Sequence, residues 1–267
     1  MRKRRFFTCL KTSVMAVTAS LFLLLPVSVQ AQAAFKGIPV LLYHYVGEEA
    51  PDYPYLNVET SEFSRQMKEL HERGYQSVSL ADLTSYMKGA SVKLPAKPVL
   101  ITFDDGYEDN YTQAFPVLKQ EGFRAAIFMV QRNFDRKNRL SVQQIQEMEQ
   151  AGIEIGSHTR SHPDLTKLAA AELEKEVGQS RRGVERLAGR PIDYFAYPGG
   201  FYNLEVLEKT AQSGYAGAFT VLPGVNRPDK DNPYLLRRIP VFSYTDFDAI
   251  LDRLETTEDT SLLDYLD

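Results

Sequence analysis

The chain has 267 residues, of which 43% are hydrophobic and 25% charged, and its formal net charge is −4. This balance suits one soluble domain with a substantial core. Removal of residues 1–33, which hold five basic and no acidic residues, would shift the net charge from −4 to −9. So acidic a chain is a poor candidate for binding nucleic acid or an anionic membrane, and we expect no nucleic-acid partner.

The first 33 residues differ sharply in composition from the rest. Four consecutive basic residues begin at Arg2, an apolar stretch runs from Val14 to Val29, and an Ala-x-Ala site ends at Ala33. This order is typical of a secretory signal peptide cleaved near Ala33. A retained membrane anchor is the alternative, although 16 apolar residues that include Pro26 are short for a membrane span. We therefore expect a secreted or cell-surface-associated protein.

The only cysteine, Cys9, lies within this signal peptide. An exported protein without disulfides relies on core packing, and its metal ligands must be histidines and carboxylates. We assign residues 34–254 to one domain and residues 255–267 to an acidic C-terminal tail, which is a helix end, a disordered segment or a segment docked through its leucines.

Apolar runs alternate with amphipathic stretches through the predicted domain. We predict strands over residues 38–43, 75–78, 99–104, 125–130, 153–157, 194–197, 216–221 and 236–242. We predict helices over residues 60–73, 81–87, 110–120, 141–151, 170–187 and 204–213. Continuous apolar strands that alternate with helices indicate a parallel sheet covered by helices. With seven or eight strands in about 220 residues, closure into an α/β barrel is favoured over an open sheet.

The predicted strand at 99–104 ends in two adjacent carboxylates, Asp104 and Asp105. Neighbouring carboxylates repel unless a cation or a shared proton relieves them. A polar turn is the simpler reading of an Asp-Asp-Gly sequence. In a parallel barrel, however, the chemistry lies at the carboxyl ends of the strands, so the other strand ends decide between the two readings.

Three of the four histidines also follow predicted strands. His44 ends the first strand, and His158 and His162 follow the strand at 153–157. The i, i+4 spacing lets both imidazoles reach one metal, and Pro163 favours a tight turn over a long helix. Two histidines and one carboxylate leave positions open for water and substrate, as in a catalytic site. The cation would bind Asp105 and leave Asp104 free as a base.

Two motifs resemble those of a known family. Thr102-Phe103-Asp104-Asp105-Gly106 and His158-Thr159-Arg160-Ser161-His162 resemble the first two motifs of the polysaccharide deacetylases, the NodB homology domain of carbohydrate esterase family 4, and the resemblance covers most of residues 36–245. It implies a distorted (β/α)7 barrel and metal-dependent removal of N-acetyl groups from a glycan. It also implies that Asp104 is the general base and that Asp105, His158 and His162 hold the metal.

The chain departs from the family pattern at the later motifs. Ala196 stands where the third motif usually has arginine, there is no tryptophan, and no histidine follows His162. The resemblance therefore assigns neither the partner of the base nor the general acid. The sequences Tyr43-His44-Tyr45 and Tyr197-Pro198-Gly199-Gly200 are similar to the subgroup that acts on poly-β-1,6-N-acetyl-D-glucosamine. That polymer is the expected substrate. The alternatives are peptidoglycan, chitin or xylan with the same metal centre, or an inactive glycan-binding domain.

His44 is the candidate for the missing acid. It ends the first strand on the same rim, and an imidazolium with a pKa near neutrality can protonate a leaving amine. The alternatives are that it hydrogen-bonds the substrate or orients its neighbours. His71 lies inside the first predicted helix, where a solvated face is expected.

The remaining expectations concern ligands and partners. Zinc is the expected metal, although cobalt, nickel or iron(II) fit the same ligands. The residues expected to bind substrate or the oxyanion are Tyr197, Pro198, Gly199, Tyr45 and Tyr107. Tyr43, Tyr53, Tyr55 and Tyr202 also lie in or beside strand-end loops, and we expect only one or two of all these tyrosines to stack on sugar. The partner is the glycan, and the protein is expected to be a monomer.

Overall fold

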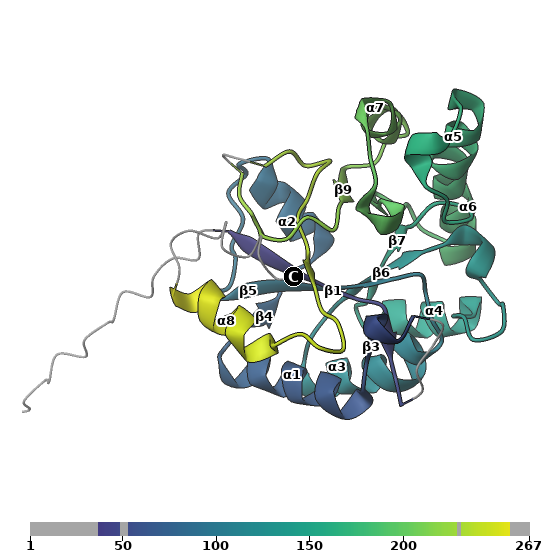
Figure 1. Ribbon diagram of the computed structural model, residues 1–267. Helices are drawn as coiled ribbons and strands as arrows, with labels where there is room; N and C mark the ends of the chain where they lie inside the picture. The colour runs from purple at the N-terminus through teal and green to yellow at the C-terminus, as the bar shows by residue number, and fades with distance from the viewer. Residues whose placement is uncertain (1–36, 49–52, 229–230, 257–267) are drawn as a thin grey trace, which may run out of the picture. The chain divides into compact units, whose positions relative to one another are not determined.

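The computed structural model describes residues 37–48, 53–228 and 231–256 (Figure 1). The predicted signal peptide and all but the first two residues of the predicted tail lie outside the described residues. Those two residues end helix α8 (Phe247–Thr256), where Glu255 forms ion pairs with Arg73 and Lys97. Within the described ranges, no helix is both long enough and apolar enough to span a membrane.

A strongly curled sheet forms the centre of the domain. Its strands lie in the order β10-β1-β5-β6-β7-β8-β9, and every pair in this order is parallel except β10 with β1. The bounds are β1 (Ile38–Tyr43), β5 (Pro98–Asp104), β6 (Ala126–Met129), β7 (Glu154–Ser157), β8 (Tyr194–Ala196), β9 (Gly217–Phe219) and β10 (Val225–Asn226). Three two-residue strands complete the main sheet and a small side sheet: β4 (Gln76–Ser77) pairs with β5, and β2 (Tyr45–Val46) pairs with β3 (Asn57–Val58).

One late segment joins the two sides of the curled sheet. Leu236 bridges to Phe219 of β9, and three residues later β11 (Ile239–Pro240) pairs in parallel with β1. The segment changes neighbours within this short span, so only two residues of the predicted strand at 236–242 form a ladder. The α/β class and the distorted (β/α)7 barrel are confirmed. The expectation of a purely parallel sheet was wrong at β10.

Helices surround the strands (Figure 1). They are α1 (Thr60–Glu72), α2 (Leu80–Met87), α3 (Phe115–Glu121), α4 (Val142–Gln150), α5 (Ala170–Glu176), α6 (Gly178–Ala188), α7 (Leu204–Gln212) and α8. Two predicted helices are interrupted. The helix predicted over 170–187 breaks at Val177, whose φ and ψ of −100° and −64° depart from helical values. The helix predicted over 110–120 starts with a π-helical turn, Asn110–Ala114, a form found often at functional sites.

Side-chain alternation along the strands separates two buried clusters. Ile101 and Phe103 of β5 belong to the larger cluster, which includes apolar residues of the surrounding helices. Leu100 belongs to the smaller cluster, with Phe128 and Phe219 from the same face of their strands. Because successive strand residues point to opposite faces, Thr102 and Asp104 share the face of Leu100. Asp104 therefore points into the curled sheet rather than toward the helices.

Gly106 offers a test of how tightly the chain is held after β5. Its φ is +68°, and an added Cβ would lie 2.3 Å from Sδ of buried Met129. We expect Gly106→Ala to lower the free energy of unfolding by about 3 kcal/mol, measured by denaturant titration, because strain and overpacking add. Gly122→Ala is the control, since its φ is +77° and nothing lies within 4 Å of the added Cβ. At Gly122 we expect the free energy of unfolding to fall by only about 1 kcal/mol, from backbone strain alone. Equal losses in the two variants would show that packing against Met129 adds nothing at Gly106.

Candidate metal centre and active site

The chain turns sharply at the carboxyl end of β5. Asp104 is the last strand residue, and Asp105 has a φ of +71°, which is uncommon for a residue other than glycine. This turn sends the two adjacent carboxylates to different places. Asp104 is 2% exposed inside the curled sheet, whereas the side chain of Asp105 is 15% exposed at its rim.

A second turn follows β7 and carries two histidines. Thr159 and His162 have φ values of +70° and +61°, and the His162 N–H donates to Oγ1 of Thr159. The carboxylate of Glu176, at the end of α5, accepts hydrogen bonds from the backbone N–H groups of Arg160 and Ser161. The segment is thus a tight turn, as Pro163 suggested, and Glu176 anchors it from a neighbouring helix.

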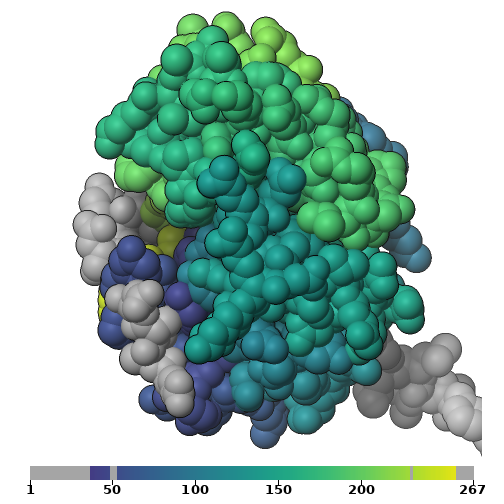
Figure 2. Space-filling view, turned by 90° about the vertical axis from the view of Figure 1, so that its right-hand side faces the viewer, coloured from purple at the N-terminus to yellow at the C-terminus, as the bar shows by residue number. Residues whose placement is uncertain are grey.

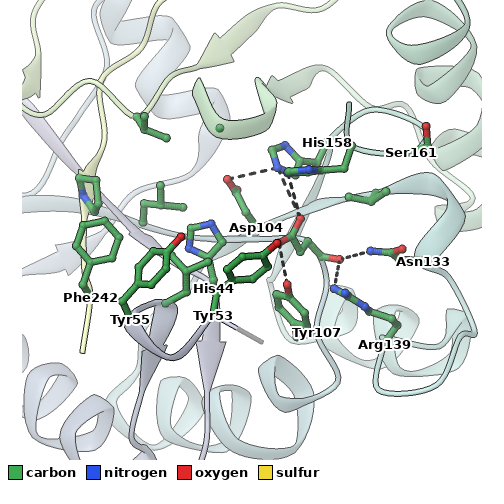
Figure 3. Close-up of a pocket in the computed structure, with 18 of the residues that line it drawn as sticks. His44, Tyr53, Tyr55, Asp104, Tyr107, Asn133, Arg139, His158, Ser161 and Phe242 are labelled. Carbon is green, nitrogen blue, oxygen red and sulfur yellow. Dashed lines mark hydrogen bonds and ion pairs between the residues drawn. The ribbon is translucent and has the colours of Figure 1, made fainter. Parts of the chain in front are cut away.

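The two turns bring three metal-ligand side chains together. One ligand atom from each of Asp105, His158 and His162 lies within 4.8 Å of the others. Oδ1 of Asp105 lies 3.8 Å from Nε2 of His158 and 3.6 Å from Nε2 of His162 (Figure 3). Ligands about 2.0–2.2 Å from a shared zinc ion are separated by distances of this order. The predicted ligand set is therefore assembled in one place.

The hydrogen bonds around the ligands suit a cation. Nδ1–H of His158 donates to the carbonyl oxygen of Ala196 at 2.8 Å, which leaves the lone pair of Nε2 directed at the site. Burial is the main cause that lowers the pKa of His158, so this imidazole is neutral, as a metal ligand must be. The hydroxyl of Tyr107 donates to Oδ2 of Asp105 at 3.1 Å and leaves Oδ1 facing the histidines. The donor set fits a divalent ion of the zinc type, and its elemental identity is not fixed by these ligands.

Asp104 has a partner that the sequence analysis did not identify. The guanidinium of Arg238 donates two hydrogen bonds to its carboxylate, both 2.8 Å long, and Arg238 is fully buried. Burial alone raises the pKa of Asp104. The charge and hydrogen bonds of Arg238 outweigh this effect and hold the pKa well below its usual range. Asp104 is therefore an ionised carboxylate held in a fixed orientation.

Arg238 supplies the buried positive charge beside Asp104, whereas the third motif has Ala196 and no arginine. Ala196 belongs to the smaller cluster inside the sheet, so its side chain points to the same interior. Arg238 enters from the segment that joins β9 to β1 and lies over the rings of Phe128 and Phe219. The available signal was an arginine within the apolar run 236–242, since a buried charge requires a partner.

His44 lies with these groups in the pocket (Figure 3). Its carbonyl oxygen accepts a hydrogen bond from Nδ2 of Asn110, the first residue of the π-helical turn and itself 1% exposed. Burial is the largest influence on the His44 imidazole and lowers its pKa, while the charges of Asp104 and Asp105 act in the opposite direction. The backbone of His44 is thus fixed by a buried side chain.

The pocket has a volume of about 950 Å³ and opens above the metal ligands. The purple, teal and yellow parts of the chain adjoin at a hollow on the surface (Figure 2). The pocket is lined by three aromatic residues, Tyr53, Tyr55 and Phe242, and by three arginines, Arg132, Arg136 and Arg139. Carbohydrate-binding sites commonly combine exposed aromatic rings with polar groups in this way.

Of the residues predicted to bind substrate, some line the pocket and others are buried in the core. Tyr107 and Gly199 line the pocket, and Tyr45 stacks behind Tyr107 with ring centroids 3.5 Å apart. Tyr197 is fully buried and its hydroxyl donates to the carbonyl oxygen of Tyr234, while Pro198 is buried and has no N–H to donate. Gly199 is thus the member of this turn that lies at the pocket. Among the other tyrosines, Tyr43 is buried in the core, Tyr202 packs against the core, and His71 is exposed on α1.

Comparisons with known proteins agree with this site. A family model described as polysaccharide deacetylase matches residues 91–218. YxkH of Bacillus subtilis (strain 168), assigned to the polysaccharide deacetylases, is 35% identical over 221 residues, which are 82% of this chain and 77% of that protein. A poly-β-1,6-N-acetyl-D-glucosamine N-deacetylase of Staphylococcus epidermidis is 28% identical over 199 residues, which are 69% and 68% of the two chains.

The solved structures give the same result. Deacetylase PplD of Streptococcus pyogenes, in complex with acetate, matches with a TM-score of 0.76 and 26% identity, over 82% of this chain and 98% of that one. The chain belongs to the polysaccharide deacetylase family. It is accordingly a hydrolase of that family, with the Asp105, His158 and His162 triad in the position of a divalent metal site.

Metal binding tests the triad directly. We expect the metal-stripped protein to bind one equivalent of Zn²⁺ by calorimetry, and His158→Ala or His162→Ala to abolish stoichiometric binding. Tyr107→Phe should weaken affinity by about tenfold, because it removes the hydrogen bond that orients Asp105. His71→Ala is the control and should bind normally, and an unchanged affinity in His162→Ala would refute the assigned ligand set.

Arg238→Gln tests the buried ion pair in metal-stripped protein. The variant should lose about 3–5 kcal/mol of unfolding free energy at pH 7, because it leaves a buried carboxylate unpaired. In the wild type the low pKa of Asp104 stabilises the fold above the unfolded value of about 3.9, and this stability is lost as the pH falls below it. In the variant, burial raises that pKa instead, so stability should increase as the pH falls from 7 to 5.

The double variant Asp104→Asn/Arg238→Gln serves as the control for that measurement. It removes both charges, so part of the lost stability should return and the added pH dependence should disappear. If the loss of unfolding free energy in the double variant equals the sum of the losses in the two single variants, the pair does not act as a unit.

Proposed function

We propose that this protein removes N-acetyl groups from an extracellular N-acetylglucosamine polymer, poly-β-1,6-N-acetyl-D-glucosamine, and releases acetate. The observation that carries the proposal is a buried, ionised Asp104 that lies 3.8 Å from a histidine of the metal triad inside an open pocket. The named relative from Staphylococcus epidermidis and the sequence forms at residues 43–45 and 197–200 support the choice of polymer. We also propose that the protein acts after export, on the basis of the signal sequence in residues 1–33.

The chemistry divides between the two adjacent aspartates. A divalent ion held by Asp105, His158 and His162 would polarise the acetamide carbonyl and lower the pKa of water. Asp104 accepts a proton from the attacking water, and the fork of Arg238 keeps its carboxylate ionised and aimed. In this proposal a backbone N–H near Gly199, which lines the pocket, would stabilise the developing oxyanion, a class of contact worth about 3 kcal/mol.

His44 completes the proton transfers in this proposal. Water oxygen bonds to the acetamide carbon, the carbon–nitrogen bond breaks, and the imidazolium of His44 gives its proton to the departing amine. The products are acetate and glucosamine within the polymer. Burial lowers the pKa of the His44 imidazole, and the charges of Asp104 and Asp105 offset this effect only in part. Asn110 holds the backbone of His44 in place.

A glycan-binding domain without activity is the contrasting function. It would require a groove and aromatic rings, but it would not require an ionised carboxylate beside a three-ligand site. Asp104, Asp105, His158 and His162 are all present and assembled, which favours the enzyme.

Acetate release from defined glycans is the measurement that separates these functions. The zinc-loaded protein should release acetate from β-1,6-linked N-acetylglucosamine oligomers, with chitin oligomers, peptidoglycan strands and acetylated xylan as competing substrates. Asp104→Asn and His44→Ala should each lower kcat by about 10²–10⁴-fold, because each removes a proton-transfer group. His71→Ala should retain full activity, and absence of acetate from every N-acetylated glycan would favour the binding domain.

A further inference from the structure

The loop between β6 and α4 concentrates positive charge on one side of the pocket. Residues 131–140 contain three arginines and one lysine against a single aspartate, in a chain whose overall net charge is −4. The three arginines line the pocket, whereas Lys137 is exposed and does not. The carboxylate of Asp135 accepts a hydrogen bond from the Val142 N–H. The local excess of positive charge is therefore directed at the pocket.

The backbone of this loop is held firmly at several points. The side chain of Asn133 donates to the carbonyl oxygen of Asp105, and the backbone N–H groups of Gln131 and Arg132 donate to carbonyl oxygens of the turn that carries the histidines. Arg139 is already engaged, since its guanidinium lies 3.9 Å from the ring centroid of Tyr107 and donates to the Asp105 carbonyl oxygen. The loop thus presents its other arginines from a fixed base.

Arg132 and Arg136 have no such engagement. Both are exposed, and within the described part of the chain neither guanidinium forms an ion pair. The two carboxylates of the pocket cannot satisfy them, because Asp104 is paired with Arg238 and Asp105 faces the histidines of the metal triad. Two unpaired guanidiniums beside a cation site form a region that attracts anions.

The opposite side of the pocket is aromatic. The rings of Tyr53 and Tyr55 lie 6.2 Å apart, and Tyr55 and Phe242 lie 6.0 Å apart. Figure 3 shows Tyr55 and Phe242 on one side of His44 and Asp104, with Asn133 and Arg139 on the other. A glycan that stacks on the rings and crosses the metal ligands would place its next sugar near the arginines.

We propose that Arg132 and Arg136 form an anion subsite that binds a carboxylate of the glycan, next to the sugar whose N-acetyl group is hydrolysed. This inference rests on the proposed deacetylation and refines its substrate to an acidic N-acetylated glycan. The carboxylate belongs either to the lactyl ether of a peptidoglycan strand or to an acidic substituent on an N-acetylglucosamine polymer. Planar guanidiniums match a carboxylate in two-point hydrogen bonding, which lysine does not. The same charges would repel a sugar that has already been deacetylated to an amine.

The test compares glycans that differ only in charge. One pair is a peptidoglycan strand with free lactyl carboxylates and the same strand with those groups converted to amides. The second pair is a β-1,6-linked N-acetylglucosamine oligomer with and without a succinyl half-ester. For the pair that carries the natural carboxylate, the zinc-loaded protein should show a KM about tenfold lower for the acidic member, and added salt should reduce this preference.

Two variants assign the preference to the proposed residues. Arg132→Gln/Arg136→Gln should raise KM for the acidic member by about tenfold, leave kcat near its original value, and leave the neutral member unaffected. Lys137→Gln removes one charge from the same loop outside the pocket and should preserve the preference. Melting temperatures of both variants should match the wild type, because all three side chains are exposed.

The outcomes separate this inference from the function on which it rests. Equal KM values for the acidic and neutral members of both pairs, or equal losses on both members in the double variant, would overturn the anion subsite and leave the deacetylase intact. Equilibrium binding to the same glycans is measured in parallel. Tighter binding of the acidic member that is lost in the double variant supports the subsite even if no acetate is released, and charge-independent binding overturns it.

Discussion

The carboxylate of Asp104 is only 2% exposed, and burying an unpaired carboxylate destabilises a fold. The fully buried guanidinium of Arg238 compensates for this burial with a hydrogen bond of 2.8 Å to each carboxylate oxygen. The Asp104–Arg238 pair is the constraint on which the site depends. It keeps Asp104 ionised without direct access to solvent, and it fixes which oxygen faces His158. Because the positive charge of Arg238 balances the negative charge of Asp104, Asp105 is free to face the two histidines. The division of roles between adjacent aspartates therefore follows from one ion pair.

Backbone conformation completes that division. Asp105, Thr159 and His162 all adopt positive φ, which costs free energy for residues other than glycine. Residues of this kind persist where surrounding contacts hold them, and they are concentrated at functional sites. Here Tyr107 and Asn133 hold the first turn, and Glu176 holds the second. The metal ligands are thus positioned by polar contacts from Tyr107, Asn133 and Glu176 rather than by their own strands alone.

Local patterns predicted the parts of this molecule that depend on local chemistry. Apolar runs and amphipathic stretches located the main strands and helices, and the strand ends located Asp104, Asp105, His44, His158 and His162. The partner of Asp104 lies 134 residues away in sequence, and only the closure of the sheet brings it near. The break at Val177 follows Glu176, which contacts the histidine turn, and the π-helical turn begins at Asn110, which contacts His44; the local patterns predicted neither feature. Tyr197 belongs to the Tyr-Pro-Gly-Gly sequence predicted to bind substrate, but packing places its ring in the core.

The segment that carries Arg238 is also the one that links β9 to β1. The interior of a curled sheet is a volume shared by all its strands, so a side chain can reach the same point from any of several positions in the sequence. A location inside the sheet is therefore not tied to one strand, and Arg238 reaches Asp104 although the third motif has Ala196. In this protein the residue that secures the base also sits in the stretch that closes the fold. Loss of order in those few residues would disable the site before the rest of the domain unfolded.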